Sequence, residues 1–209
     1  MKRFFHMTIL FVAVVSVFVS CKKEYESTIV NLKVSITHET NSRAKYLAFA
    51  EKAEEEGYKS IANMFRAVAK AESIHARSHN DVLIKLGELE FTATAETPTV
   101  KSTIENLQAA IDDEKKEYTV TYPGFIATAK KEKCNNAIET FTLANLAEEN
   151  HEMRFSEVLK AIENKQTVPL VFFVCARCGG MFTNHFSKCG ICQTDTERQY
   201  YVPLVFDVH

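Results

Sequence analysis

Two short segments constrain this chain more than any other feature: Glu72 to His75 and Glu148 to His151, each with the sequence Glu-x-x-His. Positions i and i+3 of an α-helix share one face, so each segment aims a carboxylate and an imidazole at the same point. Both segments lie on apolar stripes with helical spacing, which predicts that they face a core. A buried carboxylate is costly without a positive partner. Two facing pairs therefore predict cations between them, as in the two-metal carboxylate centres of four-helix bundles.

Helical periodicity extends over four segments of the chain. They cover approximately residues 32–56, 59–86, 102–132 and 137–162. Gly57 and Gly87 are predicted to end the first two helices. Ser102 and Glu105 have the spacing of a capping box at the start of the third helix, which Pro123 is expected to bend. The residues between Gly87 and Ser102 predict a long connection without secondary structure, as in a bundle with one crossover.

Three further acidic residues fall on the inward stripes: Glu39 in the first helix, and Glu114 and Glu117 in the third. In an antiparallel hairpin, residues at equal distances from the turn lie at the same height. The midpoint between Glu39 and the first Glu-x-x-His pair falls near Gly57. The midpoint between the third-helix pair and the second Glu-x-x-His pair falls at residues 132–133. Both midpoints are predicted turns, so all seven side chains are expected at one level of the bundle.

Other polar residues near these stripes have simpler interpretations. A single buried Glu or His is more often hydrogen-bonded than metal-bound. His79, one turn beyond His75, is therefore predicted either directly behind the metal ligands or at the rim of the site. Glu149 and Glu152 point about 100° away from the fourth-helix stripe. The alternative frame Glu149-x-x-Glu152 would also break the repeat that relates the two Glu-x-x-His pairs. Arg43 is placed on the inward stripe of the first helix.

Four of the six cysteines form two Cys-x-x-Cys pairs near the C-terminus: Cys175, Cys178, Cys189 and Cys192. Four thiolates with this spacing hold one Zn²⁺ or one iron ion tetrahedrally. The spacing leaves the metal open, because structural zinc ribbons share it, and an oxidising compartment keeps disulfides open. Short strands are predicted at residues 171–174 and 200–206. Cys134, alone at a turn, is predicted to be a structural thiol.

The first twenty residues have a basic start and an apolar stretch, which predicts a secretory signal peptide. The ending Phe18-Val19-Ser20-Cys21 resembles a lipobox, in which the signal is cut before a cysteine, here Cys21, that is then lipidated. An uncleaved membrane anchor is the alternative, although about 17 apolar residues is short for a span. Residues 21–30 are predicted to be a tether. We expect the folded part in the cell envelope, in the periplasm or on the outer surface. A net charge of −2 disfavours a nucleic-acid partner.

Together these residues resemble the rubrerythrin family. The resemblance covers residues from about 30 to 209. It rests on Glu39, Glu72, His75, Glu114, Glu117, Glu148 and His151, followed by the four paired cysteines. It implies an all-α four-helix ferritin-like bundle over residues 31–165 and a small β-rich rubredoxin-like metal-knuckle domain over residues 166–209. Tyr46 and Tyr122 resemble tyrosines that the family keeps near its metals.

The resemblance implies a non-haem peroxidase that reduces hydrogen peroxide to water. It implies two iron ions in the bundle and one iron ion, with zinc possible, at the four cysteines. Electrons from a donor protein would pass through the four-cysteine iron and cross between the subunits of a head-to-tail homodimer. Two alternatives stay open. One is a ferritin-like ferroxidase or iron-binding protein with a structural zinc ribbon, and the other is a non-catalytic metal-binding lipoprotein.

The resemblance also implies a role for each residue. Glu72 and Glu148 would bridge the two iron ions, Glu39 and Glu114 would be terminal ligands, and His151 would bind the second ion. Glu117 and His75 would exchange on the first ion, because ferric iron prefers carboxylate and ferrous iron tolerates imidazole. The residues predicted as catalytic are Glu117, His75, Tyr46 and Tyr122.

Overall fold

The computed structural model describes residues 24–169, 171–195 and 199–202 of the 209-residue chain. The predicted signal peptide and lipobox, including Cys21, lie outside the described residues, as does the predicted last strand from residue 203 onward. Of the helices in the described part, none is long and apolar enough to cross a membrane.

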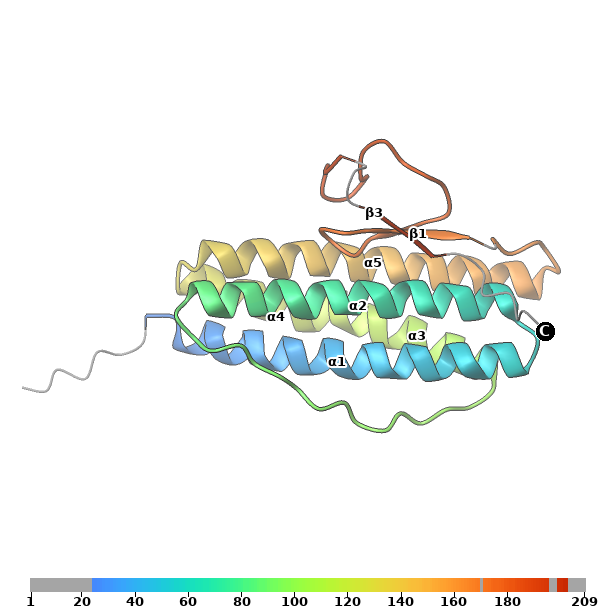
Figure 1. Cartoon of the computed structure of the whole chain (residues 1–209), viewed down its shortest axis with the longest axis horizontal. Helices are drawn as coiled ribbons and strands as arrows, with labels where there is room; N and C mark the ends of the chain where they lie inside the picture. Colours follow the sequence, from blue (N-terminus) through green and yellow to red (C-terminus); the bar gives the residue numbers. More distant parts are fainter. Residues whose placement is uncertain (1–23, 170, 196–198, 203–209) are drawn as a thin grey trace, which may run out of the picture.

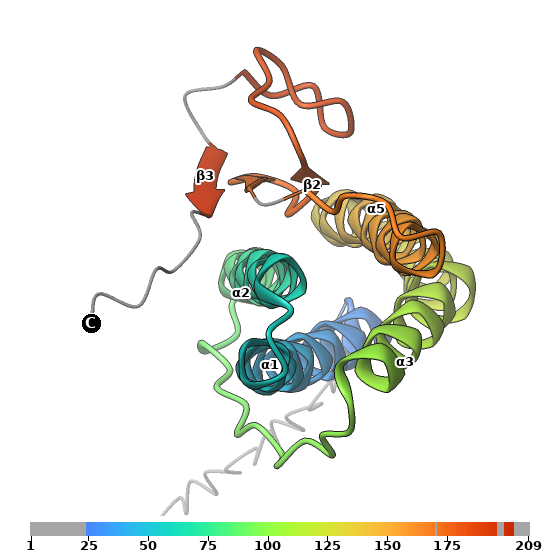
Figure 2. The ribbon, with the colours of Figure 1, turned by 90° about the vertical axis from the view of Figure 1, so that its right-hand side faces the viewer.

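Four long helical segments lie side by side in a bundle (Figure 1). The first hairpin consists of α1 (Glu26–Glu55) and α2 (Lys59–Lys85). The second consists of a segmented helix, α3 (Thr103–Lys116), η1 (Glu117–Thr121) and α4 (Tyr122–Lys131), followed by α5 (Asn135–Glu163). Viewed along the bundle, α1, α2, α3 and α5 occupy its four corners (Figure 2). The predicted ferritin-like four-helix architecture is confirmed, and the segment predicted as a tether overlaps α1.

The ends of the helices follow the sequence closely. Gly57 and Gly87 directly follow the C-cap residues of α1 and α2, so each helix stops before its glycine, as predicted, and both glycines have positive φ. Ser102 and Glu105 form the predicted capping box at the start of α3. Residues 88–102 have no regular secondary structure and run back along the bundle beside α1 (Figure 1). This crossover makes α3 parallel to α2 rather than antiparallel to it.

The third helix does not simply bend at Pro123. It widens into a π-helical turn, η1, and Pro123 lies in the first turn of α4, where its missing N–H group costs little. A π-turn accommodates one extra residue and so rotates the side chains that follow it, which is frequent at functional sites. Glu117 begins this turn and Tyr122 directly follows it, so the turn sets the direction of both side chains.

Two apolar clusters fill the bundle on either side of a central polar layer. Along α1, Ile36 belongs to one cluster, Tyr46 belongs to the other, and the buried Glu39 lies between them. The prediction of an inward Arg43 is wrong, since this side chain is exposed and Ser42 is buried instead. At about 100° per residue, Ser42 and Arg43 flank the stripe from Glu39 to Tyr46 at similar angles on opposite sides, so periodicity alone could not decide which of them is buried.

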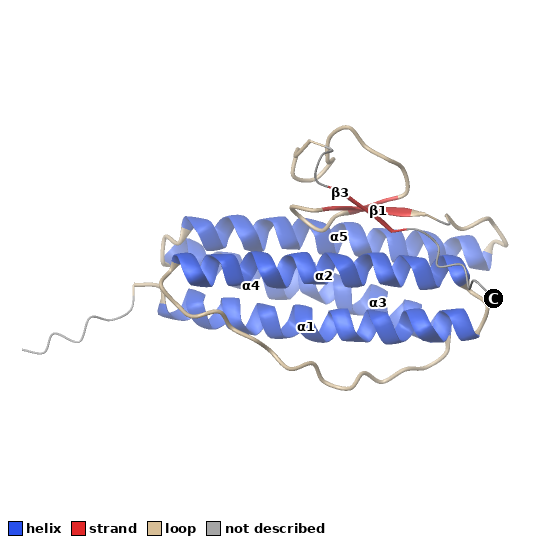
Figure 3. Ribbon diagram, viewed as in Figure 1, coloured by secondary structure: helices blue, strands red, loops and turns tan. Residues whose placement is uncertain are grey.

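A small antiparallel sheet follows α5 and is confined to one side of the bundle, over α2 and α5 (Figures 1 and 3). Its central strand β1 (Phe172–Cys175) pairs with β2 (Met181–Phe182) and with β3 (Gln199–Val202). Phe172, Val174 and Met181 are fully buried in the same apolar cluster as Tyr46 and Phe65. The C-terminal segment therefore shares a core with the bundle.

Candidate metal centres

The central polar layer collects six side chains from four helical segments, each 2% exposed or less: Glu39, Glu72, His75, Glu114, Glu148 and His151. Their ligand atoms form two overlapping groups, and within each group the atoms lie within 4.8 Å of one another. Glu39 and His75 belong to the first group, and Glu114 and His151 belong to the second. Glu72 and Glu148 belong to both. The structure thus brings six of the seven predicted bundle ligands together as two half-sites with two shared carboxylates.

Glu148 lies between the two histidines. Its Oε1 is 2.9 Å from Nδ1 of His75, and its Oε2 is 2.8 Å from Nδ1 of His151. The same Nδ1 of His75 is 3.1 Å from Oε2 of Glu72. Nδ1 is therefore the imidazole atom that faces the carboxylates in both half-sites.

Glu39 and Glu114, the two outer carboxylates that each belong to one half-site only, are both hydrogen-bonded to a tyrosine. The hydroxyl of Tyr46 donates to Oε1 of Glu114, and the hydroxyl of Tyr122 donates to Oε1 of Glu39. The other oxygens, Oε2 of Glu39 and of Glu114, are buried and accept no hydrogen bond within the described part of the chain. Each lies 3.8 Å from Nδ1 of the histidine in its own half-site. Buried oxygens without a partner are costly, and here they are the ones directed at the centre of each half-site.

The charge of the layer shifts the pKa values of its members. Burial raises the pKa of Glu72 well above its ordinary value, and the charges of Glu148 and Glu114 raise it further. Burial and the charge of Glu148 raise the pKa of Glu114 to about 7. Burial alone would lower the pKa of His75, but the charge of Glu148 and hydrogen bonds to the carboxylates raise it well above its ordinary value. The layer thus holds cationic charge strongly, as expected of a site with more carboxylates than positive groups.

Glu117 lies beside the two groups rather than within them. Its side chain is partly exposed and lines a cavity of about 200 Å³ with His38, Lys45 and others. Burial and the charge of Glu39 raise the pKa of Glu117 well above its ordinary value. Of the two residues predicted to alternate on one ion, the structure places His75 in the half-site and Glu117 next to it.

The four paired cysteines form a second cluster beyond the sheet. The Sγ atoms of Cys175 and Cys192 are 3.5 Å apart, those of Cys178 and Cys189 are 3.7 Å apart, and all four lie within 4.8 Å of one another. Metal–sulfur bonds of about 2.3 Å arranged tetrahedrally give sulfur–sulfur edges of about 3.8 Å. All four are free thiols, so this geometry suits one tetrahedral metal ion and does not match the disulfide alternative.

The backbone of the first cysteine turn contacts both histidines of the polar layer. Nε2 of His75 donates to the carbonyl oxygen of Cys178 at 2.9 Å, and Nε2 of His151 donates to that of Gly179 at 3.1 Å. Donation from Nε2 leaves the lone pair on Nδ1, the atom that faces the carboxylates, free for a cation. Gly179 has φ of 78°, and a Cβ there would lie 2.4 Å from Nε2 of His75. Only glycine allows this approach.

Several of these contacts were not predicted from the sequence. Backbone carbonyls leave no side-chain signal, so the link from the cysteine turn to the histidines could not be predicted. Asn150, whose Oδ1 accepts the Met181 N–H at 2.7 Å, was recognisable as a polar residue next to His151. Of the two positions predicted for His79, the structure shows the one behind the ligands, since the side chain is fully buried. It contacts Tyr122 and Thr140, and burial lowers its pKa to about 4.

The donor set fits two metal ions in the bundle. With both imidazoles neutral, the five carboxylates of Glu39, Glu72, Glu114, Glu117 and Glu148 carry five negative charges, and two divalent cations supply four positive ones. The buried oxygens without a hydrogen bond, Oε2 of Glu39 and of Glu114, are directed at the centres of the half-sites. Each half-site also contains one Glu-x-x-His pair, which is the arrangement found in two-metal carboxylate bundles.

Comparisons with known proteins agree with this geometry. The sequence model of the Rubrerythrin family matches residues 30–159. Nigerythrin from Nitratidesulfovibrio vulgaris is 35% identical over 167 residues, covering 79% of this chain and 82% of that protein. A rubrerythrin from Porphyromonas gingivalis is 32% identical over 157 residues, covering 74% of this chain and 78% of that protein.

Solved structures show the same similarity. Nigerythrin in a mixed-valence state superposes with a TM-score of 0.77 at 33% identity, covering 83% of this chain and 86% of that one. A bacterioferritin from Mycobacterium tuberculosis shares the fold of the bundle, with a TM-score of 0.60 at 16% identity, covering 67% of this chain and 88% of that one.

Proposed function

The chain belongs to the rubrerythrin family, and from that premise we propose that it reduces hydrogen peroxide to water at two iron ions in the bundle. The observation that carries the proposal is the pair of half-sites with two shared carboxylates, hydrogen-bonded through their histidines to a four-cysteine cluster. Peroxide reduction needs two electrons close together, and the two half-sites would hold two adjacent ions that could supply them. In defence against oxidative stress this chemistry would remove peroxide without releasing oxygen.

The residues that would hold iron follow from the two groups. Glu39 and His75 would bind the first ion, Glu114 and His151 the second, and Glu72 and Glu148 both. When bound, the ferrous ions would supply the two electrons that reduce peroxide. Glu117 is proposed to replace His75 on the first ion after oxidation, and the cavity beside Glu117 is proposed as the route of peroxide. These roles rest on the family resemblance and on the positions of the side chains.

Three kinds of group in the protein would prepare the site for metal: tyrosine hydroxyls, backbone carbonyl groups and the apolar clusters. The tyrosine hydroxyls orient the outer carboxylates so that their second oxygens face inward. The carbonyl groups of Cys178 and Gly179 fix the orientation of the imidazoles. The two apolar clusters exclude water from either side of the polar layer, which strengthens its electrostatic interactions.

Electron supply is proposed to run through an iron ion at the four cysteines. The hydrogen bonds from His75 and His151 join that cluster to the polar layer of the same chain, which supports transfer within one chain. The family resemblance instead implies transfer between the chains of a head-to-tail homodimer, and the electron-donor protein is proposed to meet the cluster from outside.

The test of the function is a spectroscopic one. Protein loaded with iron and oxidised should show ferric-thiolate absorption that bleaches on anaerobic reduction and returns when hydrogen peroxide is added, with peroxide consumed in proportion. A colourless protein that takes up only zinc and does not consume peroxide would contradict the proposal. Oxidation of added ferrous iron without any response of the thiolate absorption would favour the ferroxidase alternative.

We also propose that the chain is exported and anchored in the cell envelope through a lipid on Cys21. The support is the sequence pattern of the first 21 residues. Metabolic labelling with a radioactive fatty acid should mark the wild-type protein and not a Cys21→Ser variant. Equal labelling of both proteins would contradict lipidation at this cysteine.

A further inference from the structure

We propose that Thr140, His79 and Tyr122 form a proton-transfer chain from a surface pocket to Glu39 in the polar layer. The inference rests on the proposed peroxidase function and deepens it by assigning where protons enter. Reduction of one hydrogen peroxide molecule to two water molecules consumes two electrons and two protons. The ferrous ions of the proposed function would supply the electrons, whereas the protons must come from solvent through the protein.

The chain is a continuous series of hydrogen bonds. Oγ1 of Thr140 lies 3.0 Å from Nδ1 of His79, and Nε2 of His79 lies 3.1 Å from the hydroxyl oxygen of Tyr122. The hydroxyl of Tyr122 donates to Oε1 of Glu39. His79 and Tyr122 are 1% exposed or less, and Thr140 is 8% exposed. The series therefore begins near the surface and ends at a carboxylate of the first half-site.

The hydrogen bonds all point in one direction. Tyr122 uses its single O–H to donate to Glu39, so its oxygen accepts from His79, which must carry its proton on Nε2. Nδ1 of His79 is then an acceptor, and the hydroxyl of Thr140 donates to it. Every donor is oriented toward the polar layer. A proton entering at Thr140 can move inward by one hop at each hydrogen bond, with no group left charged at the end.

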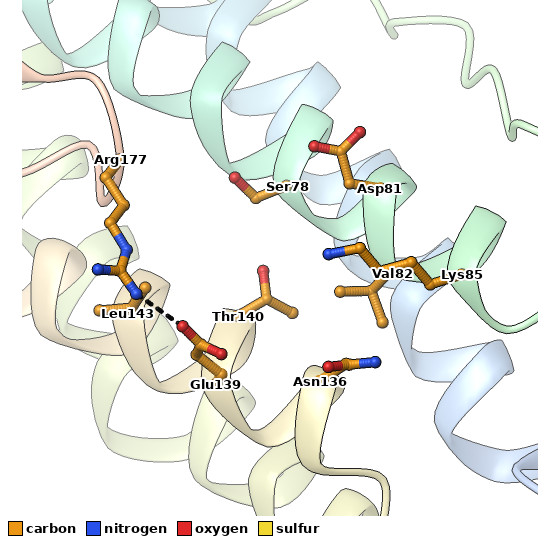
Figure 4. A pocket seen from close by; sticks show the side chains of 9 residues that line it. All are labelled: Ser78, Asp81, Val82, Lys85, Asn136, Glu139, Thr140, Leu143 and Arg177. Carbon is orange, nitrogen blue, oxygen red and sulfur yellow. Dashed lines mark hydrogen bonds and ion pairs between the residues drawn. The ribbon is translucent and has the colours of Figure 1, made fainter. Parts of the chain in front are cut away.

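The outer end of the chain opens into a polar pocket between α2 and α5. The pocket has a volume of about 180 Å³, and its lining includes Ser78, Asp81, Asn136 and Thr140. Figure 4 shows Thr140 at the centre of the lining side chains, with the Arg177–Glu139 hydrogen bond of 2.7 Å at one side. A polar pocket of this size can hold the water molecules from which the first proton would come.

Among the residues that the structure describes, no comparable connection leads to the other half-site. Tyr46 also donates to an outer carboxylate, Glu114, but its ring is surrounded by Phe49, Phe65 and Phe155 at centroid distances of 6.2, 6.0 and 5.6 Å. Apolar rings carry no protons. The two half-sites thus share their ligand pattern and differ in what lies behind the tyrosine, which assigns proton entry to the His79 side.

Proton balance is satisfied at each transfer. A water molecule in the pocket gives a proton to the oxygen of Thr140 as Thr140 gives its own to Nδ1 of His79. His79 passes the proton on Nε2 to the oxygen of Tyr122, and Tyr122 passes its own proton to the Glu39 side. One proton arrives at the layer, and an acid in the bulk solvent, hydronium or a buffer acid, protonates the hydroxide left in the pocket, so that one proton has left the solvent. Return of His79 to its first tautomer restores the chain.

The kinetic test compares two substitutions at the outer end. Thr140→Val keeps the size of the side chain and removes the hydroxyl, whereas Thr140→Ser keeps the hydroxyl. Thr142→Val is the matched control, because its hydroxyl on the same helix only donates to the backbone oxygen of Ile138 at 2.6 Å. In reduced, iron-loaded protein, Thr140→Val should slow oxidation by peroxide about 10-fold or more, within the usual contribution of positioned proton transfer, and should increase the solvent deuterium isotope effect.

The Ser variant and the control should keep the wild-type rate and isotope effect within about 2-fold, a small part of that contribution. Equal iron content and equal absorption spectra of all the variants would show that the metal sites are intact. A Thr140→Val protein with the wild-type rate and isotope effect would overturn the proposal.

A second measurement does not depend on activity. In zinc-loaded protein, long-range ¹H–¹⁵N NMR should show the His79 ring protonated at Nε2 only, with the signal assigned by its loss in a His79→Gln variant. Protonation at Nδ1, or at both nitrogens, would overturn the proposed direction of the chain. If wild-type protein did not consume peroxide, the proposed function would fail, and the NMR measurement would still decide whether the chain of hydrogen bonds exists.

Discussion

At the scale of single residues, Glu148 is distinguished by its contact with both histidines of the polar layer. Both of its oxygens lie within 3 Å of a histidine nitrogen, one in each half-site. Burial alone would raise its pKa, but His75 and His151 together hold the pKa well below its ordinary value. Its repeat partner Glu72 has a raised pKa, although both belong to both groups. The repeat in the sequence predicted that the two residues are equivalent in position but could not predict this difference in charge state.

We expect Glu148→Ala to abolish iron binding in the bundle and to leave the thiolate-bound iron in place. The reason is that each half-site loses a shared carboxylate while the four cysteines are untouched. Metal analysis should fall from about three ions to one per chain, the full complement being two in the bundle and one at the cysteines. Glu149→Ala, next to it and exposed, should keep all three. Full peroxidase activity in Glu148→Ala would show that the assignment of ligands is wrong.

At the scale of elements, two short segments outside the regular α-helices position groups of the metal site. The π-turn η1 sets the directions of Glu117 and Tyr122, and the first cysteine turn brings a backbone carbonyl to each histidine. Periodicity predicted the helices and their acidic stripes because an α-helix has a constant repeat. It could not predict the π-turn, which breaks that repeat, or the carbonyl contacts, which involve no side chain of the turn.

Gly179→Ala should push the first cysteine turn away from the polar layer. The new Cβ would lie 2.4 Å from Nε2 of His75 at a backbone conformation that alanine disfavours. We expect slower electron transfer from the thiolate-bound iron to the bundle, measured by stopped-flow absorption, with a loss of stability of about 1–3 kcal/mol. The control is Gly190→Ala, where the nearest atom to a Cβ is 3.7 Å away. An unchanged transfer rate in Gly179→Ala would argue against a role for this contact.

At the scale of the whole molecule, the polar layer is a charged section between two apolar cores. In metal-free protein the raised pKa values of Glu72, Glu114, His75 and His151 mean that the folded state binds more protons than the unfolded state between about pH 5 and 8. Stability conferred by these protons is present at the acidic end of the window and is lost as pH rises. The lowered pKa of Glu148 affects stability only below that window. The lowered pKa of His79 acts in the opposite direction at the acidic end of the window, as one group against the four with raised pKa values.

Metal-free protein should therefore be more stable at pH 6 than at pH 8, by at least about 1 kcal/mol. The midpoint of urea unfolding at the two pH values measures this difference. Iron-loaded protein should lose the dependence or reverse it, because metal ions compete with protons for the same ligands. Greater stability of the metal-free protein at pH 8 would contradict the pKa shifts assigned to the layer.

The path of the electrons can be tested by mixing two inactive variants. Glu148→Ala removes the bundle site and Cys178→Ser removes the four-cysteine site. If electrons pass within one chain, as the contacts of His75 and His151 suggest, chains refolded together should stay inactive. Recovery of about a quarter or more of the wild-type activity would favour transfer between the chains of a dimer, since symmetric dimers exchange equivalent surfaces.

The core that the sheet shares with the bundle has a mechanical consequence. Phe172, Val174 and Met181 anchor the sheet among the same side chains that hold the helices together. Because of this shared packing, we expect the four-cysteine cluster to keep a fixed separation from the polar layer while the fold is intact. The electron transfer proposed for the cluster would then need no docking step within the molecule.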